Sequence, residues 1–189
     1  MSSASGWERL WLSCAVVTGS SRRPLLFLDV DGPLVPFGAG SQQYRNHATG
    51  RDLPGAGGNP LLARINPAHG PRLAGLPCEV VWATTWMDDA NACIAPLLGL
   101  PRLPVVAWPE PSGIEEQDER EGLHWKTRAL VARAAGRPFV WVDDEITGTD
   151  RLWVAAHHPG HALLHRVDAG PGLTDDDYVA IEAWLRQRW

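Results

Sequence analysis

Runs of apolar residues alternate along the chain with segments whose apolar positions recur at helical spacing. Continuous apolar runs, typical of strands buried on both faces of a parallel sheet, occupy residues 24–31, 78–85, 105–108, 139–144 and 161–167. Helical spacing marks residues 59–65, 86–98, 123–135 and 150–157, and a last segment that Thr174 caps. The alternation predicts an α/β fold with a parallel sheet and right-handed crossover connections.

Three segments fall outside this alternation. Residues 1–23 have apolar positions at helical spacing and end in a linker, so we expect an N-terminal appendage before a single domain over residues 24–189. Residues 32–58 are rich in glycine and have no periodicity, which is typical of a functional or a disordered loop. Residues 109–121 hold six acidic residues and one arginine and are expected to form a solvated, mobile loop.

Composition limits the classes of function. Of the 189 residues, 44% are hydrophobic and 21% are charged, as in ordinary globular domains. The net charge is −5, whereas a protein that coats nucleic acid is normally basic, so charge leaves a nucleic-acid end open as a partner without favouring it. No apolar run approaches the roughly 20 residues of a membrane helix, and the three cysteines lack CxxC spacing. We therefore expect a cytoplasmic protein without membrane contact. The sequence does not determine its oligomeric state.

Polar residues stand at the carboxyl ends of three predicted strands. They are Asp29 and Asp31 after the first strand, Thr84 and Thr85 after the second, and Asp143 and Asp144 after the fourth. Because the carboxyl ends of parallel strands meet at one edge, where ligands bind, we expect a cluster of carboxylates there. Several carboxylates close together cannot all stay ionised without a cation, and oxygen ligands suit Mg²⁺. The sequence therefore predicts a magnesium site at this edge.

Lys126 adds a positive charge to this group. It is the one lysine among 17 basic residues and lies in the predicted helix before the fourth strand. A metal ion beside a lysine and a threonine hydroxyl is typical of a phosphate-binding site. Taken alone, Asp31-Gly32 is an ordinary turn and Asp143-Asp144 an ordinary helix cap. Their combination with Lys126 favours phosphate chemistry.

These residues also form a series of motifs. The motifs are FLDVDGPL at 27–34, WAT at 82–84, Lys126, and VDDE at 142–145. In this order they resemble the four motifs of the haloacid dehalogenase-like (HAD) superfamily, of which the first is DxDG. The WATTW stretch at 82–86 and the GLT…WL pattern from residue 172 resemble the HAD domains of bacterial RNA-repair proteins and their stand-alone relatives. The resemblance implies a three-layer, Rossmann-like fold with sheet order 3-2-1-4-5 and no large cap domain.

The resemblance implies roles for the two aspartates of the first motif. Asp29 would be the nucleophile that forms an aspartyl-phosphate, which divides one difficult displacement into two easier ones. Asp31 would protonate the leaving oxygen and then activate water, as general acid and general base. Both would also bind Mg²⁺, Asp29 through its carboxylate and Asp31 through its main-chain carbonyl.

The resemblance also implies how the phosphoryl group and the metal are held. Thr84 would hydrogen bond a phosphoryl oxygen, with Thr85 as the alternative, because the apolar run places Thr84 nearer the strand end. Lys126 would neutralise charge on the phosphoryl group and on the nucleophile. Asp144 would ligate Mg²⁺, and Asp143 would be either a second metal ligand or the residue that orients Lys126.

A phosphatase is the activity that the resemblance implies first. Dehalogenase members lack a carboxylate at the position of Asp31, and phosphonatases use a second lysine, which this chain does not have. Residues 32–58 and 107–122 are too short for a cap domain, so we expect an open site that admits a large or nucleotide-type substrate. The prediction is a Mg²⁺-dependent phosphomonoester hydrolase. The alternatives are a phosphotransferase and a non-catalytic phospho-ligand-binding or assembly module.

Ten tryptophans are many for a chain of this length. Those at apolar-face positions are predicted to pack in the core: Trp82, Trp125, Trp141, Trp153 and Trp184. Trp86 and Trp108 follow strand ends near the predicted site. There they would either pack in its wall or stack on a base or ring of the substrate.

Overall fold

The computed structural model describes residues 23–38, 44, 46–47, 59–110 and 113–187. The predicted appendage over 1–23 lies outside the described residues, apart from its last residue, and so does most of the predicted loop over 32–58. The appendage and the missing cap domain therefore stay predictions.

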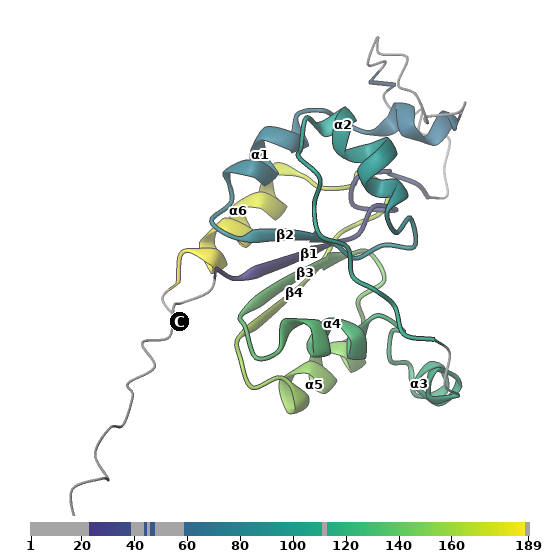
Figure 1. Cartoon of the computed structure of the whole chain (residues 1–189), viewed down its shortest axis with the longest axis vertical. Coiled ribbons are helices and arrows are strands. Elements are labelled where there is room, and N and C mark those ends of the chain that lie inside the picture. The colour runs from purple at the N-terminus through teal and green to yellow at the C-terminus, as the bar shows by residue number, and fades with distance from the viewer. Residues whose placement is uncertain (1–22, 39–43, 45, 48–58, 111–112, 188–189) are drawn as a thin grey trace, which may run out of the picture.

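Four parallel strands form the central sheet (Figure 1). They are β1 (Leu25–Leu28), β2 (Glu79–Trp82), β3 (Phe139–Asp143) and β4 (Ala162–Arg166), in the order β2-β1-β3-β4. Leu28, at the end of β1, lies opposite Trp82 on β2 and Val142 on β3. The carboxyl ends of these strands therefore meet at one edge, and the predicted α/β, Rossmann-like fold with a parallel sheet is confirmed.

The third predicted strand, over 105–108, is reduced to a single bridge. Val105 pairs in parallel with Trp82, beside β2, where the order 3-2-1-4-5 places this segment. Pro104 and Pro109 flank the segment and have no N–H to donate to a ladder. The predicted number of strands is therefore wrong, although the segment lies on the expected side of the sheet.

Helices cover both faces of the sheet and make three layers (Figure 1). They are the 3₁₀ segment η1 (Pro60–Arg64), α1 (His69–Gly75), the π-helical turn η2 (Ala90–Ile94), α2 (Ala95–Leu98), α3 (Ile114–Glu121), α4 (Thr127–Ala134), α5 (Gly148–His157) and α6 (Asp175–Leu185). Figure 1 shows α1, α2 and α6 on one side of the sheet and α4 and α5 on the other. The three-layer architecture is therefore the predicted one.

Alternate residues of β1 point into two hydrophobic cores. Leu26 and Leu28 belong to the core shared with α1 and α6, whereas Leu25 and Phe27 belong to the core under α4 and α5. All four side chains are fully buried, and burial of each contributes about 1.5–3 kcal/mol. The strand is thereby fixed, and the residue that follows it, Asp29, is held at the edge of the sheet.

An acidic helix, α3, occupies most of the segment predicted to be a solvated, mobile loop over 109–121, so that prediction is wrong. Gly113 and Gly122 take left-handed conformations at its two ends, with φ of 79° and 74°. Asp118 is buried and forms a bidentate ion pair of 2.6 and 2.7 Å with Arg128 on α4. Glutamate and glutamine favour helices, and this tertiary contact fixes the helix against the domain.

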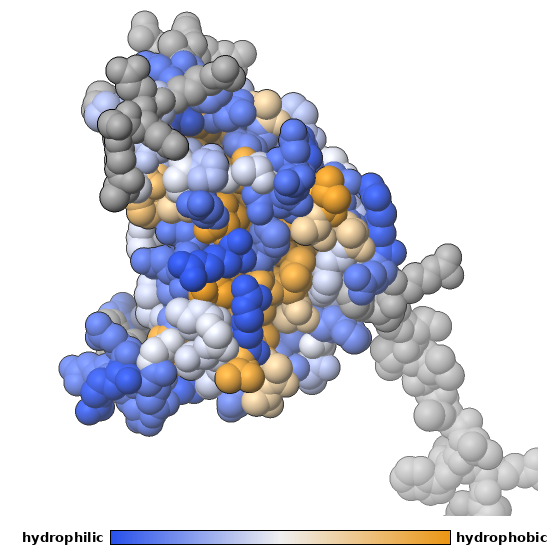
Figure 2. Space-filling model, turned by 180° about the vertical axis from the view of Figure 1, so that it is seen from behind, coloured by the Kyte–Doolittle hydropathy of each residue, from blue (hydrophilic) through white to orange (hydrophobic). Residues whose placement is uncertain are grey.

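One face of the molecule is mainly hydrophilic. Hydrophilic residues cover most of the face seen in Figure 2, and apolar residues form smaller areas between them. Among the described segments, no helix has the length and apolar character needed to cross a bilayer.

Candidate active site

Asp29 follows β1 at the carboxyl edge of the sheet and is 7% exposed. Its main-chain N–H continues the ladder to the carbonyl of Val142 at 3.0 Å. Its Oδ1 accepts the N–H of Val30 at 2.8 Å, and its Oδ2 lies 2.8 Å from Lys126 Nζ. The backbone and an ammonium group therefore fix both oxygens of the predicted nucleophile.

Lys126 immediately precedes α4, and its buried ammonium lies between two carboxylates. Nζ is 2.8 Å from Oδ2 of Asp29 and 2.8 Å from Oδ2 of Asp143. Asp143 ends β3 and is fully buried. Its Oδ2 also accepts Trp141 Nε1 at 3.1 Å, and its Oδ1 accepts the N–H of Glu145 at 2.9 Å. Both oxygens of Asp143 are engaged, which favours the second of its two predicted roles, the orientation of Lys126.

The site holds more negative than positive charge. Burial, together with the charge of Asp143, raises the pKa of Asp29 to about 7 against the opposing charge of Lys126. Burial also raises the pKa of Asp144, and Asp143 adds to this. Burial alone would lower the pKa of Lys126, but its two carboxylate partners hold that pKa above its ordinary value. The group contains three carboxylates and one ammonium, so a further cation would favour the ionised forms of the carboxylates.

The donor set fits Mg²⁺. Asp29, Asp143 and Asp144 each offer a carboxylate oxygen, and these oxygens lie within 4.8 Å of one another. Asp143 is fully buried and accepts three hydrogen bonds, whereas Asp29 and Asp144 retain some exposure, so these two are the better candidates for metal ligands. Gly32 has φ of 84°, and a Cβ there would clash with the Asp144 carboxylate, so a glycine lets the backbone after Asp31 approach that group. An all-oxygen site of this kind suits a hard divalent ion.

Asp31 lies at the same edge, in the turn that follows β1. Its side chain is half-buried, and its Oδ2 accepts the indole N–H of Trp86 at 3.0 Å. The turn is closed by the N–H of Gly32, which donates to the carbonyl of Val35 at 3.0 Å. The structure thus places the predicted general acid two residues beyond the predicted nucleophile and beside an aromatic donor.

The two threonines after β2 differ in exposure. Thr84 is fully buried, and Thr85 is exposed. The Oγ1 of Thr84 accepts the N–H of Trp86 at 3.3 Å, and its carbonyl accepts Trp108 Nε1 at 3.2 Å. Both threonines stand at the edge where the phosphoryl group is expected, and which of them contacts it stays a prediction.

The fold and the order of these residues match a known family. The family model for the HAD domain in Swiss Army Knife RNA repair proteins matches residues 25–178. The chain belongs to this family. The matched segment contains all four strands and every predicted site residue. Searches among curated proteins and among solved structures gave no significant match.

His124 is a site residue of this HAD domain that sequence reasoning missed. Its Nδ1 accepts the main-chain N–H of Lys126 at 3.1 Å, so in the neutral ring Nε2 carries the proton and donates to Glu145 Oε2 at 3.1 Å. The main-chain N–H of His124 donates to Asp150 Oδ1 at 2.8 Å. His124, Asp143 and Glu145 also form a group of metal-ligand type, but hydrogen bonds engage both ring nitrogens. The contacts favour a role of His124 in holding Lys126. Sequence analysis could not find this role, because a histidine two residues before a lysine is not a recognisable motif.

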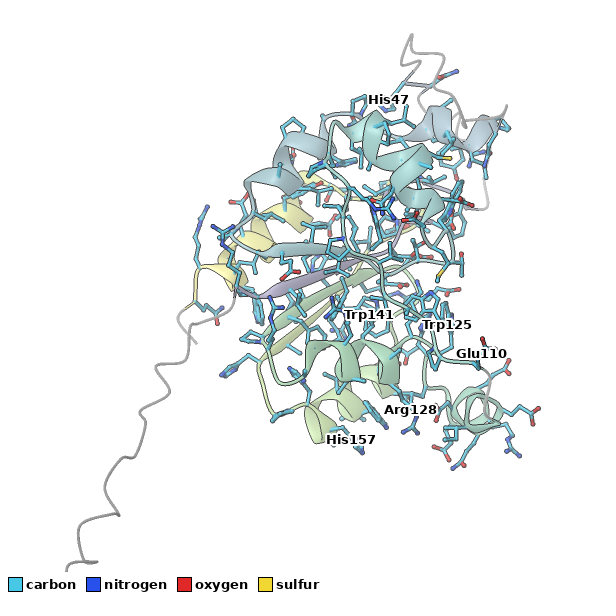
Figure 3. The ribbon with its side chains drawn as sticks, viewed as in Figure 1. His47, Glu110, Trp125, Arg128, Trp141 and His157 are labelled. Carbon is cyan, nitrogen blue, oxygen red and sulfur yellow. The ribbon has the colours of Figure 1, made fainter. Side chains whose placement is uncertain are left out.

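The tryptophans of the HAD domain divide between core and site. Trp82 and Trp141 are fully buried as predicted, and Trp153 and Trp184 are half-buried. Trp125 is 42% exposed, so its predicted place in the core is wrong. Trp125 and Lys126 are consecutive residues in the turn before α4, but the Lys126 side chain is buried whereas that of Trp125 is exposed. Figure 3 shows Trp125 near the end of the molecule where the strands terminate.

Trp108 and Trp125 form an aromatic platform beside the predicted phosphate-binding residues. Their ring centroids are 4.7 Å apart at an interplanar angle of 68°, and the Trp125 ring centroid lies 5.4 Å from Lys126 Nζ. A hollow of about 460 Å³ borders Trp125 and is also lined by Glu116 and Glu119 of α3. The platform presents an exposed ring next to the ammonium group of the site.

Proposed function

We propose that this HAD domain is a Mg²⁺-dependent phosphomonoester hydrolase that acts through an aspartyl-phosphate on Asp29. Family membership supports hydrolase chemistry in general. The observation that carries the finer proposal is the buried arrangement of Asp29, Lys126 and Asp143, in which an ammonium lies 2.8 Å from each carboxylate. This arrangement presents a nucleophile together with the charge that a phosphoryl group needs.

In the first step, an Asp29 carboxylate oxygen attacks phosphorus and the bond from phosphorus to the leaving oxygen breaks. Asp31 gives its proton to that oxygen, so that an alcohol leaves. Lys126, held by Asp143 and by the loop of His124, neutralises charge on the transferred group. Asp29 and Asp144 would hold Mg²⁺, which when bound supplies further neutralisation of phosphoryl charge.

In the second step, water attacks phosphorus of the aspartyl-phosphate. Asp31, now ionised, takes the proton of the water, and the bond between phosphorus and the Asp29 oxygen breaks. The products are inorganic phosphate and the regenerated carboxylate. The same side chain serves as acid and then as base, so its protonation state is restored at the end of the cycle.

A nucleotide-type substrate, including the end of an RNA strand, is the class we propose. The platform of Trp108 and Trp125 supports it, because base–aromatic stacking tolerates any base. The family description refers to RNA repair proteins. The carboxylates of Glu116 and Glu119 beside the platform would repel a long polyanion, so a single terminal nucleotide fits better than an extended strand. We place this activity in the cytoplasm.

Phosphate release from phenyl phosphate tests the proposal. We expect turnover in wild-type protein with Mg²⁺, little turnover in EDTA, and a loss of more than about 10³-fold in Asp29→Asn. Asp176→Asn, an exposed carboxylate on α6, is the matched control and should retain full activity. Turnover in Asp29→Asn equal to that of wild type would contradict the aspartyl-phosphate.

The two alternatives give different outcomes in the same assay. A phosphotransferase would release phenol and pass the phosphoryl group to an added alcohol rather than to water. A phospho-ligand-binding module would release nothing from any substrate but would be stabilised against heat by Mg²⁺ and phosphate. The general acid Asp31 argues against this module, because pure binding does not need it.

A further inference from the structure

Trp86 is tied to two of the proposed site residues at once. Its indole Nε1 donates to Oδ2 of Asp31 at 3.0 Å, and its main-chain N–H donates to Oγ1 of Thr84 at 3.3 Å. Its ring is half-buried and packs against the hydrophobic core that includes Leu28. Over the part of the chain that the structure describes, Trp86 is the one hydrogen-bond donor to the Asp31 carboxylate.

The backbone around Trp86 has an unusual conformation. Met87 has φ of 48°, in the left-handed region that residues with a Cβ rarely adopt. Its N–H donates to the carbonyl of Thr84 at 3.3 Å, and the N–H of Asp89 donates to the carbonyl of Trp86 at 3.0 Å. Backbone strain of this kind is retained mainly where the surrounding structure holds it and where function uses it. The turn sets the direction in which the indole points.

We propose that Trp86 is the positioning residue of the general acid: its indole N–H orients the Asp31 carboxyl group by holding Oδ2 and leaves Oδ1 as the favoured position of the transferable proton. The inference rests on the proposed role of Asp31 and goes beyond it, since it assigns a function to the tryptophan that follows the Thr84-Thr85 pair.

Hydrogen-bond chemistry gives the location of the proton. An indole N–H can only donate, so Oδ2 of Asp31 must act as an acceptor in both protonation states. The carbonyl oxygen of a neutral carboxyl group is a better acceptor than its hydroxyl oxygen, so this hydrogen bond favours the proton on Oδ1, the oxygen that Trp86 does not engage. In the first step this O–H bond breaks as the leaving oxygen gains the proton. In the second step Oδ1 gains a proton from water, and the carboxyl group keeps its orientation throughout.

The leaving group decides how much this positioning matters. A 4-nitrophenolate leaves readily without a proton, whereas a phenolate or an alkoxide needs one. Loss of the indole N–H should therefore slow the cleavage of poor leaving groups selectively. A purely structural role of Trp86 in packing the core would lower the activity on all substrates by the same factor.

Values of kcat/KM for 4-nitrophenyl phosphate, phenyl phosphate and glycerol 2-phosphate test the inference in wild type and Trp86→Phe. This parameter reports steps up to formation of the aspartyl-phosphate and is unaffected by its hydrolysis. We expect Trp86→Phe to lose less than about threefold on 4-nitrophenyl phosphate and about 10- to 100-fold on glycerol 2-phosphate, with phenyl phosphate between them. The ratio between substrates in one preparation does not depend on the fraction of folded protein.

Trp153→Phe is the matched control, because Trp153 is also a half-buried tryptophan but lies on α5 and has no proposed role at the site. Whatever activity it loses should be lost equally on all three substrates. An equal loss on all three in Trp86→Phe, or no loss on any, overturns the inference while the proposed hydrolase stands. Absence of turnover in the wild type on every substrate overturns both, and a large loss in Trp86→Phe confined to 4-nitrophenyl phosphate also overturns the inference.

Discussion

At the scale of single residues, the main feature of the site is a buried ammonium group between two carboxylates. Lys126 is 2% exposed and contacts two carboxylates at 2.8 Å. A compact ammonium group makes both contacts from one atom, whereas the wider, planar guanidinium of an arginine requires a fork-shaped set of acceptors. This difference gives a physical reason for the one lysine in a chain whose other basic residues are all arginines.

Replacement of Trp125 by alanine tests the aromatic platform. We expect kcat/KM for adenosine 5′-monophosphate to fall about tenfold, because stacking contributes about 1–3 kcal/mol per base. Ribose 5-phosphate, which has the same phosphoryl group and sugar but no base, should be affected less than about twofold. The measurement is the ratio of the two values in each protein.

Trp153→Ala is the control for this substitution. Trp153 is half-buried on α5, where its ring centroid lies 4.1 Å from that of His157, and Figure 3 shows His157 well apart from Trp125. It should leave the ratio at its wild-type value. If Trp125→Ala lowers activity on both substrates alike, the platform does not bind the base.

The sequence predicts the positions of the charged site residues but not the contacts that orient them. Asp29 and Asp144 are predictable because each follows a buried strand. Lys126 is predictable because it lies at the start of the helix that precedes the second of these strands. The bond from Trp86 to Asp31 joins residues 55 positions apart, and its direction depends on a turn that includes a left-handed methionine. Periodicity describes which face a residue occupies, not how a loop aims its side chain.

At the scale of elements, two helices begin with the same device but differ in what it supports. Thr174 and Asp177 form a capping box at the start of α6, and Thr147 and Asp150 form one at the start of α5. Asp150 is fully buried and also accepts the hydroxyl of Thr127 at 2.7 Å. Burial would raise the pKa of Asp150, but these hydrogen bonds hold it below its ordinary value. This carboxylate therefore joins the start of α5 to the start of α4, which Lys126 immediately precedes.

Substitution of Asp150 or Asp177 by asparagine distinguishes helix capping from support of Lys126. Asp150→Asn should lower the free energy of unfolding by about 3 kcal/mol, because a buried group with several charge-assisted hydrogen bonds is lost, and should also lower kcat of the folded protein through displacement of Lys126. Asp177→Asn should cost about 1 kcal/mol and leave kcat unchanged. Urea unfolding and turnover of both variants provide the comparison. Equal kcat in the two variants would show that Asp150 acts only as a cap.

At the scale of the whole molecule, the layer of helices opposite α4 and α5 carries an acid-sensitive contact. His69 on α1 shares a hydrogen bond of 3.0 Å between its Nδ1 and the hydroxyl of Tyr178 on α6. Burial lowers the pKa of His69 to about 4, and the charges of Arg72 and His47 contribute. The native protein therefore binds a proton at His69 less readily than the unfolded chain does.

Stability should consequently depend on pH through this residue. Between pH 6.5 and pH 4 the unfolded state binds more protons, so the contribution of His69 is fully present above pH 6.5 and is lost as the pH falls through this window. The difference in unfolding free energy between wild type and His69→Asn, which cannot titrate, should decrease by about 2 kcal/mol from neutral to acid pH. A difference that does not change between these pH values would contradict the assignment.

Pro104 and Pro109, which flank residues 105–108, affect how readily the sheet can pair with a strand of another copy of the chain. An exposed sheet edge is a template on which another chain can add a strand, and such addition leads to aggregation. The segment between Pro104 and Pro109 occupies the edge of β2 through one bridge and offers no regular row of N–H groups in return. The short segment therefore covers the β2 edge of the sheet without itself presenting the regular edge of a full strand.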